Sequence, residues 1–100
     1  SAGSIVIIGN VNPGAEVIAQ QDIIVVGILR GNAHAGAGGN TSAIIMALAL
    51  EPKQLRIASH LGLPPASDEP VNRSKYTPEV AYVDDKQIVI EPYTGRLPVT

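Results

Sequence analysis

Apolar residues recur with a fixed spacing along the first half of the chain. Every sixth position from residue 5 is apolar, and these positions are Ile5, Val11, Val17, Ile23, Leu29 and Ala35. Residues 5–19 (IVIIGNVNPGAEVIA) are echoed eighteen positions later by residues 23–37 (IIVVGILRGNAHAGA). Self-similarity at a fixed period is typical of repeat architectures, and three six-residue units in each echo indicate a three-sided coil of short strands. The sequence therefore predicts an all-β fold, a short parallel β-helix of about three to four coils with a triangular cross-section.

The odd-numbered apolar positions are the predicted interior, because the side chains of a strand alternate between its two faces. The even-numbered positions then face outward, yet they are also apolar: Val6, Ile8, Ile24, Val26, Ile44 and Met46. A contiguous exposed apolar patch usually marks an interaction site, and burying each such side chain is worth about 1.5–3 kcal/mol. We therefore predict that these residues form the interface of a homodimer, the commonest homo-oligomer. The alternative is that the C-terminal segment covers them within one chain.

Turn residues separate the predicted strands. The segments Asn12-Pro13-Gly14 and Arg30-Gly31-Asn32 have the composition of turns. Residues 36–40 (GAGGN) predict a looser turn that breaks the register. A third coil is expected at an offset of about twenty from the second, which places Ile45 beside Val25.

The later part of the chain is less regular. Residues 43–50 (AIIMALAL) are predicted to be a strand of the third coil, although their propensities also allow a short helix. Residues 61–78 hold four Pro and predict an irregular surface loop. The apolar runs around Asp84-Asp85-Lys86 predict a terminal strand or hairpin, which caps the otherwise unpaired edges of the last coil. The predicted organisation is a β-helix domain over residues 1–92, including that loop, and a tail over residues 93–100.

Composition excludes several classes of function. The chain has 100 residues, a net charge of −2 and a 3% share of aromatic residues. Nucleic-acid-binding domains instead present a basic face, often with aromatic platforms for the bases. The lack of Cys excludes a disulfide scaffold and thiolate chemistry, and it fits a cytoplasmic protein. No apolar run reaches the length of a transmembrane helix. We therefore expect no nucleic-acid partner and no direct insertion into a membrane.

No catalytic set, cofactor motif or metal site stands out. Gly36-Ala37-Gly38-Gly39 matches neither the P-loop nor the dinucleotide fingerprint. His34 and His60 lack the spacing of metal ligands. We therefore expect no enzymatic activity, no cofactor and no metal. Two alternatives stay open: an acyltransferase-type β-helix enzyme that uses His34 as its base, and a self-polymerising β-helix scaffold.

Several segments of the chain resemble the C-terminal domain of the bacterial septum site-determining protein MinC. They are residues 9–19 (GNVNPGAEVIA), 27–31 (GILRG), 33–37 (AHAGA), 54–58 (QLRIA), 78–83 (PEVAYV) and 88–92 (IVIEP). The resemblance implies a right-handed β-helix that forms a homodimer. It also implies binding to the ATP-bound form of the ATPase MinD, which recruits this cytoplasmic protein to the inner membrane surface, so that membrane contact is indirect. In the family, an N-terminal domain, which lies outside this chain, prevents misplaced septa by antagonising FtsZ assembly.

The resemblance also implies where MinD would bind. Gly14 and Glu16 fall in the turn that contacts MinD in the family, and Asn12 and Arg30 are added because each ends a strand beside a turn. A Gly turn allows another backbone to approach closely, and an exposed carboxylate and guanidinium give directional contacts. The alternative is that Gly14 only satisfies its turn and that Glu16 is solvated. The family's Arg-Ser-Gly-Gln motif, also part of the MinD surface, lies just upstream of residue 1, so we expect this chain alone to bind MinD weakly or not at all.

Overall fold

The computed structural model describes residues 3–51, 54–62 and 78–93. Within these ranges the strands are β1 (Ile5–Ile8), β2 (Glu16–Ile18), β3 (Ile23–Leu29), β4 (Asn32–Ala35), β5 (Ile45–Leu50), β6 (Leu55–Ile57), β7 (His60–Gly62), β8 (Glu79–Asp84) and β9 (Gln87–Pro92). The described part of the chain holds no helix that could cross a membrane. Most of the predicted loop and nearly all of the predicted tail lie outside the described residues. The all-β prediction is confirmed for the residues that the structure describes.

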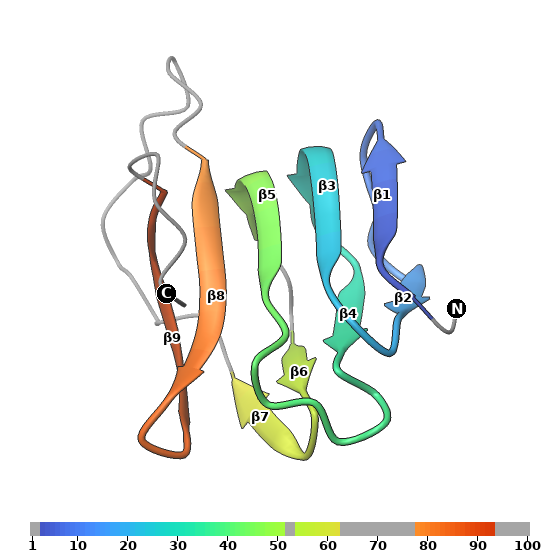
Figure 1. Ribbon diagram of the computed structural model, residues 1–100. Coiled ribbons are helices and arrows are strands. Elements are labelled where there is room, and N and C mark those ends of the chain that lie inside the picture. The colour runs from blue at the N-terminus through green and yellow to red at the C-terminus, as the bar shows by residue number, and fades with distance from the viewer. Residues whose placement is uncertain (1–2, 52–53, 63–77, 94–100) are drawn as a thin grey trace.

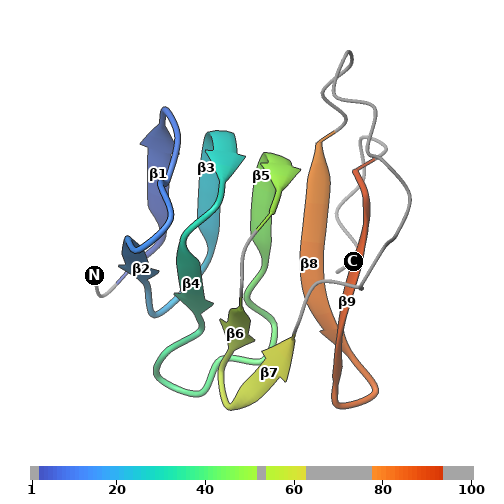
Figure 2. The same cartoon turned by 180° about the vertical axis from the view of Figure 1, so that it is seen from behind.

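The strands form two sheets (Figures 1 and 2). The first sheet has the order β1-β3-β5-β8-β9, and the second has the order β2-β4-β6-β7. Strands β1, β3 and β5 are parallel to one another, and so are β2, β4 and β6. We call β1 with β2 the first level, β3 with β4 the second and β5 with β6 the third. The remaining pairs, β5–β8, β8–β9 and β6–β7, are antiparallel, so both sheets are mixed.

The first two levels follow the eighteen-residue echo on one sheet only. On the first sheet Ile5 lies beside Ile23, as the echo predicts. On the second sheet Val17, and not Ala15, lies beside Ala33. The first level has the longer turn between its two strands, and these additional residues shift the pairing on the second sheet.

The third level is displaced from the predicted register. Ile45 lies beside Ile23 and not beside Val25, so the offset is 22 residues and the predicted offset of twenty is wrong. The second sheet keeps the same offset. The additional residues lie in the turn of residues 36–42, which the echo of the first two levels does not contain. Because this offset is even, odd positions still point inward as far as Ala47, and Arg56 stays exposed, as expected. Beyond the irregularity between Val25 and Ile28 the offset on the first sheet is 21, and the even-numbered Leu50 is buried.

The space between the sheets is filled by aliphatic side chains, mostly from the predicted odd positions. Ile5, Ile7 and Val17 are partly buried and pack against a buried cluster that includes Val11, Ile23, Val25, Leu29, Ile45, Leu55 and Ile57. The strand prediction for residues 43–50 is correct for β5, and the helix alternative is wrong. The inward set predicted from alternation is confirmed.

The β8–β9 hairpin closes the open side of the third level, in agreement with the predicted cap. Strand β8 pairs antiparallel with β5. Asp85 and Lys86 in the hairpin turn have φ angles of 51° and 65°, as a tight two-residue hairpin turn requires. Oε1 of Glu79 accepts a hydrogen bond from the Leu50 N–H at 3.2 Å, which joins the hairpin to the end of β5.

The second sheet ends in a strand that the sequence analysis assigns to the irregular loop. Leu61 and Gly62 belong to β7, which pairs antiparallel with β6. The chain reverses at Ala58 and Ser59, where Ala58 has a φ of 55°. The predicted loop therefore begins too early, because a hairpin with so short a strand leaves little periodicity to detect.

Asp22 joins the levels at the point where their first strands begin. Its C=O accepts a hydrogen bond from the Ile5 N–H at 2.9 Å, and its Oδ1 accepts one from the Ile44 N–H at 2.9 Å. Asp22→Ala is expected to lower the free energy of unfolding by about 1–2 kcal/mol, because the Ile44 N–H loses its acceptor. Asp22→Asn keeps an acceptor oxygen and should lose much less. Urea unfolding of both variants checks this, and an equal loss in both would contradict the assigned role of Oδ1.

Candidate protein-interaction surfaces

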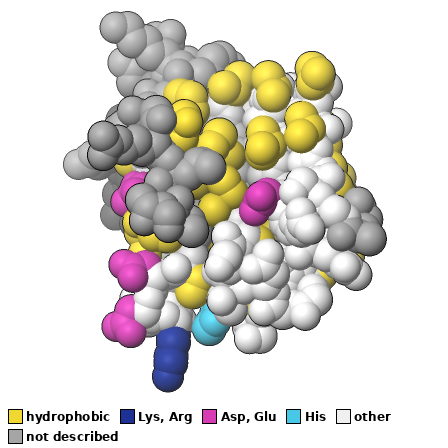
Figure 3. Space-filling model, in the orientation of Figure 1, with side chains coloured by type: hydrophobic (Ala, Val, Ile, Leu, Met, Phe, Trp, Pro, Cys, Tyr) yellow, Lys and Arg dark blue, Asp and Glu magenta, His cyan; other side chains and the backbone are white. Residues whose placement is uncertain are grey.

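The outer face of the first sheet is apolar. Val6, Ile8 and Val26 are 61%, 86% and 46% exposed, and Ile24 and Met46 are half-buried beside them. The register places Val6 beside Ile24, and Ile24 beside Met46. Ile8 lies beside Val26 in the same way. Hydrophobic side chains gather on this side of the molecule, over β1, β3 and β5 (Figure 3). We call these five residues the apolar face.

Ile44 does not belong to this exposed surface, so its placement there is wrong. It is only 6% exposed, and its C=O accepts a hydrogen bond from the Ile23 N–H at 3.0 Å. With the actual offset it precedes β5 and does not lie beside Ile24. Leu48, which the sequence analysis does not name, is half-buried on β5 opposite the irregularity in β3 between Val25 and Ile28. Continued alternation beyond Met46 is the signal that points to it.

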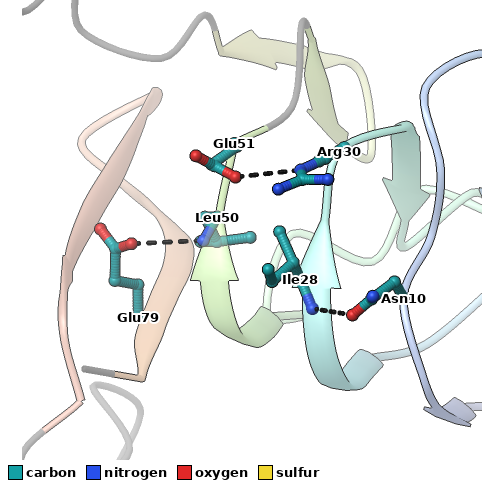
Figure 4. A network of polar contacts seen from close by, with 6 residues as sticks. All are labelled: Asn10, Ile28, Arg30, Leu50, Glu51 and Glu79. Carbon is teal, nitrogen blue, oxygen red and sulfur yellow. Dashed lines mark hydrogen bonds and ion pairs between the residues drawn. The ribbon is translucent and has the colours of Figure 1, made fainter. Parts of the chain in front are cut away.

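Polar groups border the apolar face. A hollow of about 180 Å³ is lined by Asn10, Gly27, Ile28 and Leu48, and Oδ1 of Asn10 accepts a hydrogen bond from the Ile28 N–H at 2.9 Å (Figure 4). On β8, Tyr82 lies two residues beyond Val80, the partner of Met46. Desolvation and a hydrogen bond with Glu91 raise the pKa of Tyr82 above its ordinary value, so this hydroxyl stays protonated at neutral pH. An apolar centre with a polar rim is the usual anatomy of a protein interface.

The turns after β1 and β3 stack at one corner of the molecule, and this corner holds Asn12, Gly14 and Arg30. The Asn12 C=O accepts a hydrogen bond from the Ala15 N–H at 3.0 Å. Gly14 has a φ of 90°, which a type II turn requires at its third position. The Arg30 N–H donates to the Val11 C=O at 2.8 Å, so Arg30 follows directly on the next level. The structure therefore brings these three predicted contact residues together.

The side chain of Arg30 is held by the third level. Its Nε lies 3.2 Å from Oε2 of Glu51, and the two side chains are 49% and 29% exposed (Figure 4). An ion pair this exposed contributes little to stability, about 0–1 kcal/mol. Its effect is to fix the direction of the guanidinium at the corner.

Glu16, the fourth predicted contact residue, points away from the corner onto the second sheet. It lines a depression of about 200 Å³ with Asn32, Ala33, His34, Gln54 and Arg56. We call this the polar depression. Asn32, Gln54 and Arg56 are exposed, and the sequence analysis does not name them as contact residues. Only the register of β2, β4 and β6 brings together residues so far apart in sequence.

His34 is engaged in holding the second sheet. Its Nε2 lies 2.9 Å from the Ala58 C=O, and because a carbonyl only accepts, this nitrogen carries the proton. The hydrogen bond fixes the turn between β6 and β7. Among the described residues there is no group of His, Asp and Glu that could hold a metal ion.

Stacked strands with an apolar face, an ordered corner and a polar depression define an all-β module whose surfaces suit the binding of other proteins. Comparison with known families then identifies it further. The chain belongs to the family described as "Septum formation inhibitor MinC, C-terminal domain", whose model matches residues 1–93. This confirms the resemblance. The family consists of division regulators, so the chain is not an enzyme and the acyltransferase alternative is wrong.

Named relatives and a solved structure agree with this family. The probable septum site-determining protein MinC of Acetivibrio thermocellus is 50% identical over 91% of this chain and 39% of its own length. The protein of the same name from Persephonella marina is 56% identical over 89% of this chain and 43% of its own length. A chain of the MinC:MinD cell division protein complex of Aquifex aeolicus is 43% identical, with a TM-score of 0.82 over 96% of this chain and 76% of that chain. The chain thus spans less than half the length of these curated relatives.

Proposed function

We propose that this chain is the dimerisation and MinD-binding module of an inhibitor that prevents misplaced FtsZ rings and septa. The observation that carries the proposal is the similarity to a chain of the MinC:MinD complex, at 43% identity over nearly the whole chain. In this function the module binds the ATP-bound form of MinD, which recruits the cytoplasmic protein to the inner membrane surface. A separate N-terminal domain of the longer protein acts on FtsZ.

The proposed form of the scaffold is a short right-handed parallel β-helix with a triangular cross-section. The parallel pairing of the three levels on both sheets supports it. The isolated parallel bridge between Val11 and Leu29 also supports it, because this bridge joins the first two levels between the sheets. Stacked levels of this kind present rows of side chains at fixed spacing, as a binding surface requires.

The proposed dimer interface is the apolar face. Three of its residues expose nearly half of their surface or more, and fully burying each aliphatic side chain is worth about 1.5–3 kcal/mol. Scaled by these exposures, the three side chains on each of two copies supply roughly 6–12 kcal/mol together, against an association cost of about 4–15 kcal/mol. The gain is of the same size as this cost, which is compatible with a self-complementary two-fold dimer.

The proposed MinD contact is the corner of Asn12, Gly14 and Arg30, together with Glu16. Gly14 has open space around the position of a Cβ, so a partner backbone could approach the turn closely. The Glu51 carboxylate orients Arg30 at the same corner. An oriented guanidinium loses less conformational freedom when it binds an acidic group than a mobile one does.

The binding experiment compares this chain with a version extended upstream through the family's Arg-Ser-Gly-Gln motif. Purified MinD is added with ATP or with ADP, and the dissociation constant is measured by biolayer interferometry. We expect ATP-dependent binding of the extended version and weaker binding of this chain. Failure of the extended version to bind MinD in ATP would overturn the proposed function.

The role of Arg30 is tested in the extended version with two variants. Arg30→Ala is expected to weaken MinD binding about tenfold, because the variant loses a charged contact that the complex with MinD would bury. Glu51→Ala removes the ion pair but keeps the guanidinium, so it should weaken binding much less. Equal weakening by both variants would mean that Arg30 acts only through its ion pair.

A further inference from the structure

The polar depression holds two opposite charges that do not neutralise each other. Glu16 begins β2 and Arg56 lies in β6, with β4 between these strands. By register, Glu16 lies beside Asn32 on one row of side chains, and Arg56 lies beside His34 on the next row. Two strand spacings and a two-residue step place the Cα atoms of Glu16 and Arg56 about 12 Å apart. Among the described residues neither side chain forms an ion pair, whereas Arg30 does.

Two amide side chains lie in the depression together with these two charges. Asn32 and Gln54 both line the depression and are exposed. Within the described ranges neither amide side chain forms a hydrogen bond, whereas His34 in the same depression is hydrogen-bonded to the Ala58 C=O. The depression therefore offers an acceptor at Glu16, a donor at Arg56 and amide groups of both kinds between them.

Two exposed apolar side chains lie on the same row of the second sheet as Arg56. Ile18 and Leu61 are 44% and 53% exposed, and in the described part of the chain they are the large exposed hydrophobic residues outside the apolar face. Both belong to the row of Arg56, since Ile18 lies beside His34 and Leu61 lies beside Arg56. Leu61 lies directly beside Arg56, whereas Ile18 lies at the other end of the same row, beyond His34. Arg is enriched among the interface residues that contribute most to binding, and the contacts around such residues exclude water. A merely solvated face does not require this arrangement.

We propose that the polar depression, with Ile18 and Leu61, is a second contact surface for MinD, continuous with the corner. This surface binds two opposite charges on the partner. A basic group lies opposite Glu16, and an acidic group lies about 12 Å away, opposite Arg56. Glu16 follows the turn of Asn12 and Gly14 and also lines the depression, so a partner seated on the corner extends over it. This inference rests on the proposed binding of MinD and adds Arg56 to its contact residues.

The first test measures MinD binding by Arg56→Ala in the upstream-extended version, with ATP present. The dissociation constant should rise about tenfold, and Arg56→Lys should restore part of the loss. Lys86→Asn is the matched control, because it also removes one positive charge, from the exposed hairpin turn on the other sheet. Its affinity should equal that of the wild type. Arg56 is exposed, so thermal unfolding of the variant should be unchanged.

The second test exchanges the charges by combining Glu16→Arg with Arg56→Glu, which keeps the net charge. We expect a loss of affinity of at least about thirtyfold, because each partner group then meets its own sign, and the loss should shrink at high salt. Wild-type affinity in the exchanged variant or in Arg56→Ala would overturn this inference and leave the proposed function intact. If the wild type itself does not bind MinD, the proposed function fails first.

Discussion

Replacing Ile8 and Val26 together by Asp is expected to convert the proposed dimer into a monomer. The two residues lie side by side on β1 and β3, and they expose 86% and 46% of their surface. A two-fold interface contains each of them twice, so the variant buries four carboxylates in place of four aliphatic side chains. The lost burial alone exceeds about 4 kcal/mol, which corresponds to at least a thousandfold rise in the dissociation constant of the dimer. Sedimentation velocity at tens of micromolar protein measures it.

Because Ile8 and Val26 face solvent in one chain, the double substitution should not unfold the monomer, so a loss of the dimer can be assigned to the interface. A side chain that faces solvent in the monomer can be replaced by a polar one with a change of about 0.5 kcal/mol or less in unfolding free energy. Leu61→Asp is the matched control, because Leu61 is 53% exposed on the second sheet, and it should leave the dimer intact. A dimer that survives the double substitution shows that the apolar face is not the interface, and a monomeric wild type would contradict dimerisation altogether. Concentration-dependent filaments without MinD would instead favour a self-polymerising scaffold.

The apolar face was largely predictable from the sequence because alternation survives errors of register. An even error in the offset moves residues along a strand but leaves each side chain on the same side of the sheet. For this reason Val6, Ile8, Ile24, Val26 and Met46 are placed on the outer face even though the third level is shifted. The pairing of residues between levels depends more strongly on the offset, since a two-residue error gives every residue of the strand a different neighbour on the next level.

The wrong placement of Ile44 on the exposed face arises where the regular period of the sequence ends. The turn of residues 36–42 is closed by its own hydrogen bonds, such as the one from the Gly39 N–H to the Gly36 C=O at 2.8 Å. Its length is therefore set by local turn chemistry and not by the repeat. Composition predicts that a turn breaks the register there, but it does not state how many residues the turn absorbs. The exposed surface at the third level could not be fixed without that number.

The polar depression could not be predicted because its residues share no local pattern. Glu16, Asn32 and Arg56 become neighbours only through the pairing of β2, β4 and β6. The second sheet has an offset of 16 residues between its first two strands, as shown by Val17 beside Ala33, and not the eighteen of the echo. Applying the echo to this sheet would have brought the wrong side chains together. The corner residues were easier to place, because each adjoins a recognisable turn.

Gly31→Ala is expected to cause the largest loss of stability among single substitutions in the corner. A Cβ at Gly31 would lie 2.4 Å from the Ala15 carbonyl oxygen and 2.7 Å from the Asn12 carbonyl oxygen. Both are backbone atoms, so relief requires the first two levels to separate. Such overpacking costs about 3 kcal/mol or more, a large part of the stability of a domain this small. For a chain of this length the melting temperature should fall by roughly 12–24 °C, which differential scanning calorimetry measures.

Gly38→Ala separates this clash from the general effect of removing a glycine. No atom lies within 4 Å of a Cβ at Gly38, so this variant should stay within about 1 kcal/mol of the wild type, with any gain coming from the unfolded chain. A similar stability for both variants would mean that the levels at the corner are not in close contact. Because the Asn12 carbonyl is one of the atoms that must move, Gly31→Ala should also displace the Asn12–Ala15 turn. Any Gly31→Ala protein that still folds should therefore bind MinD less tightly than Gly38→Ala, although neither position itself carries a contacting side chain.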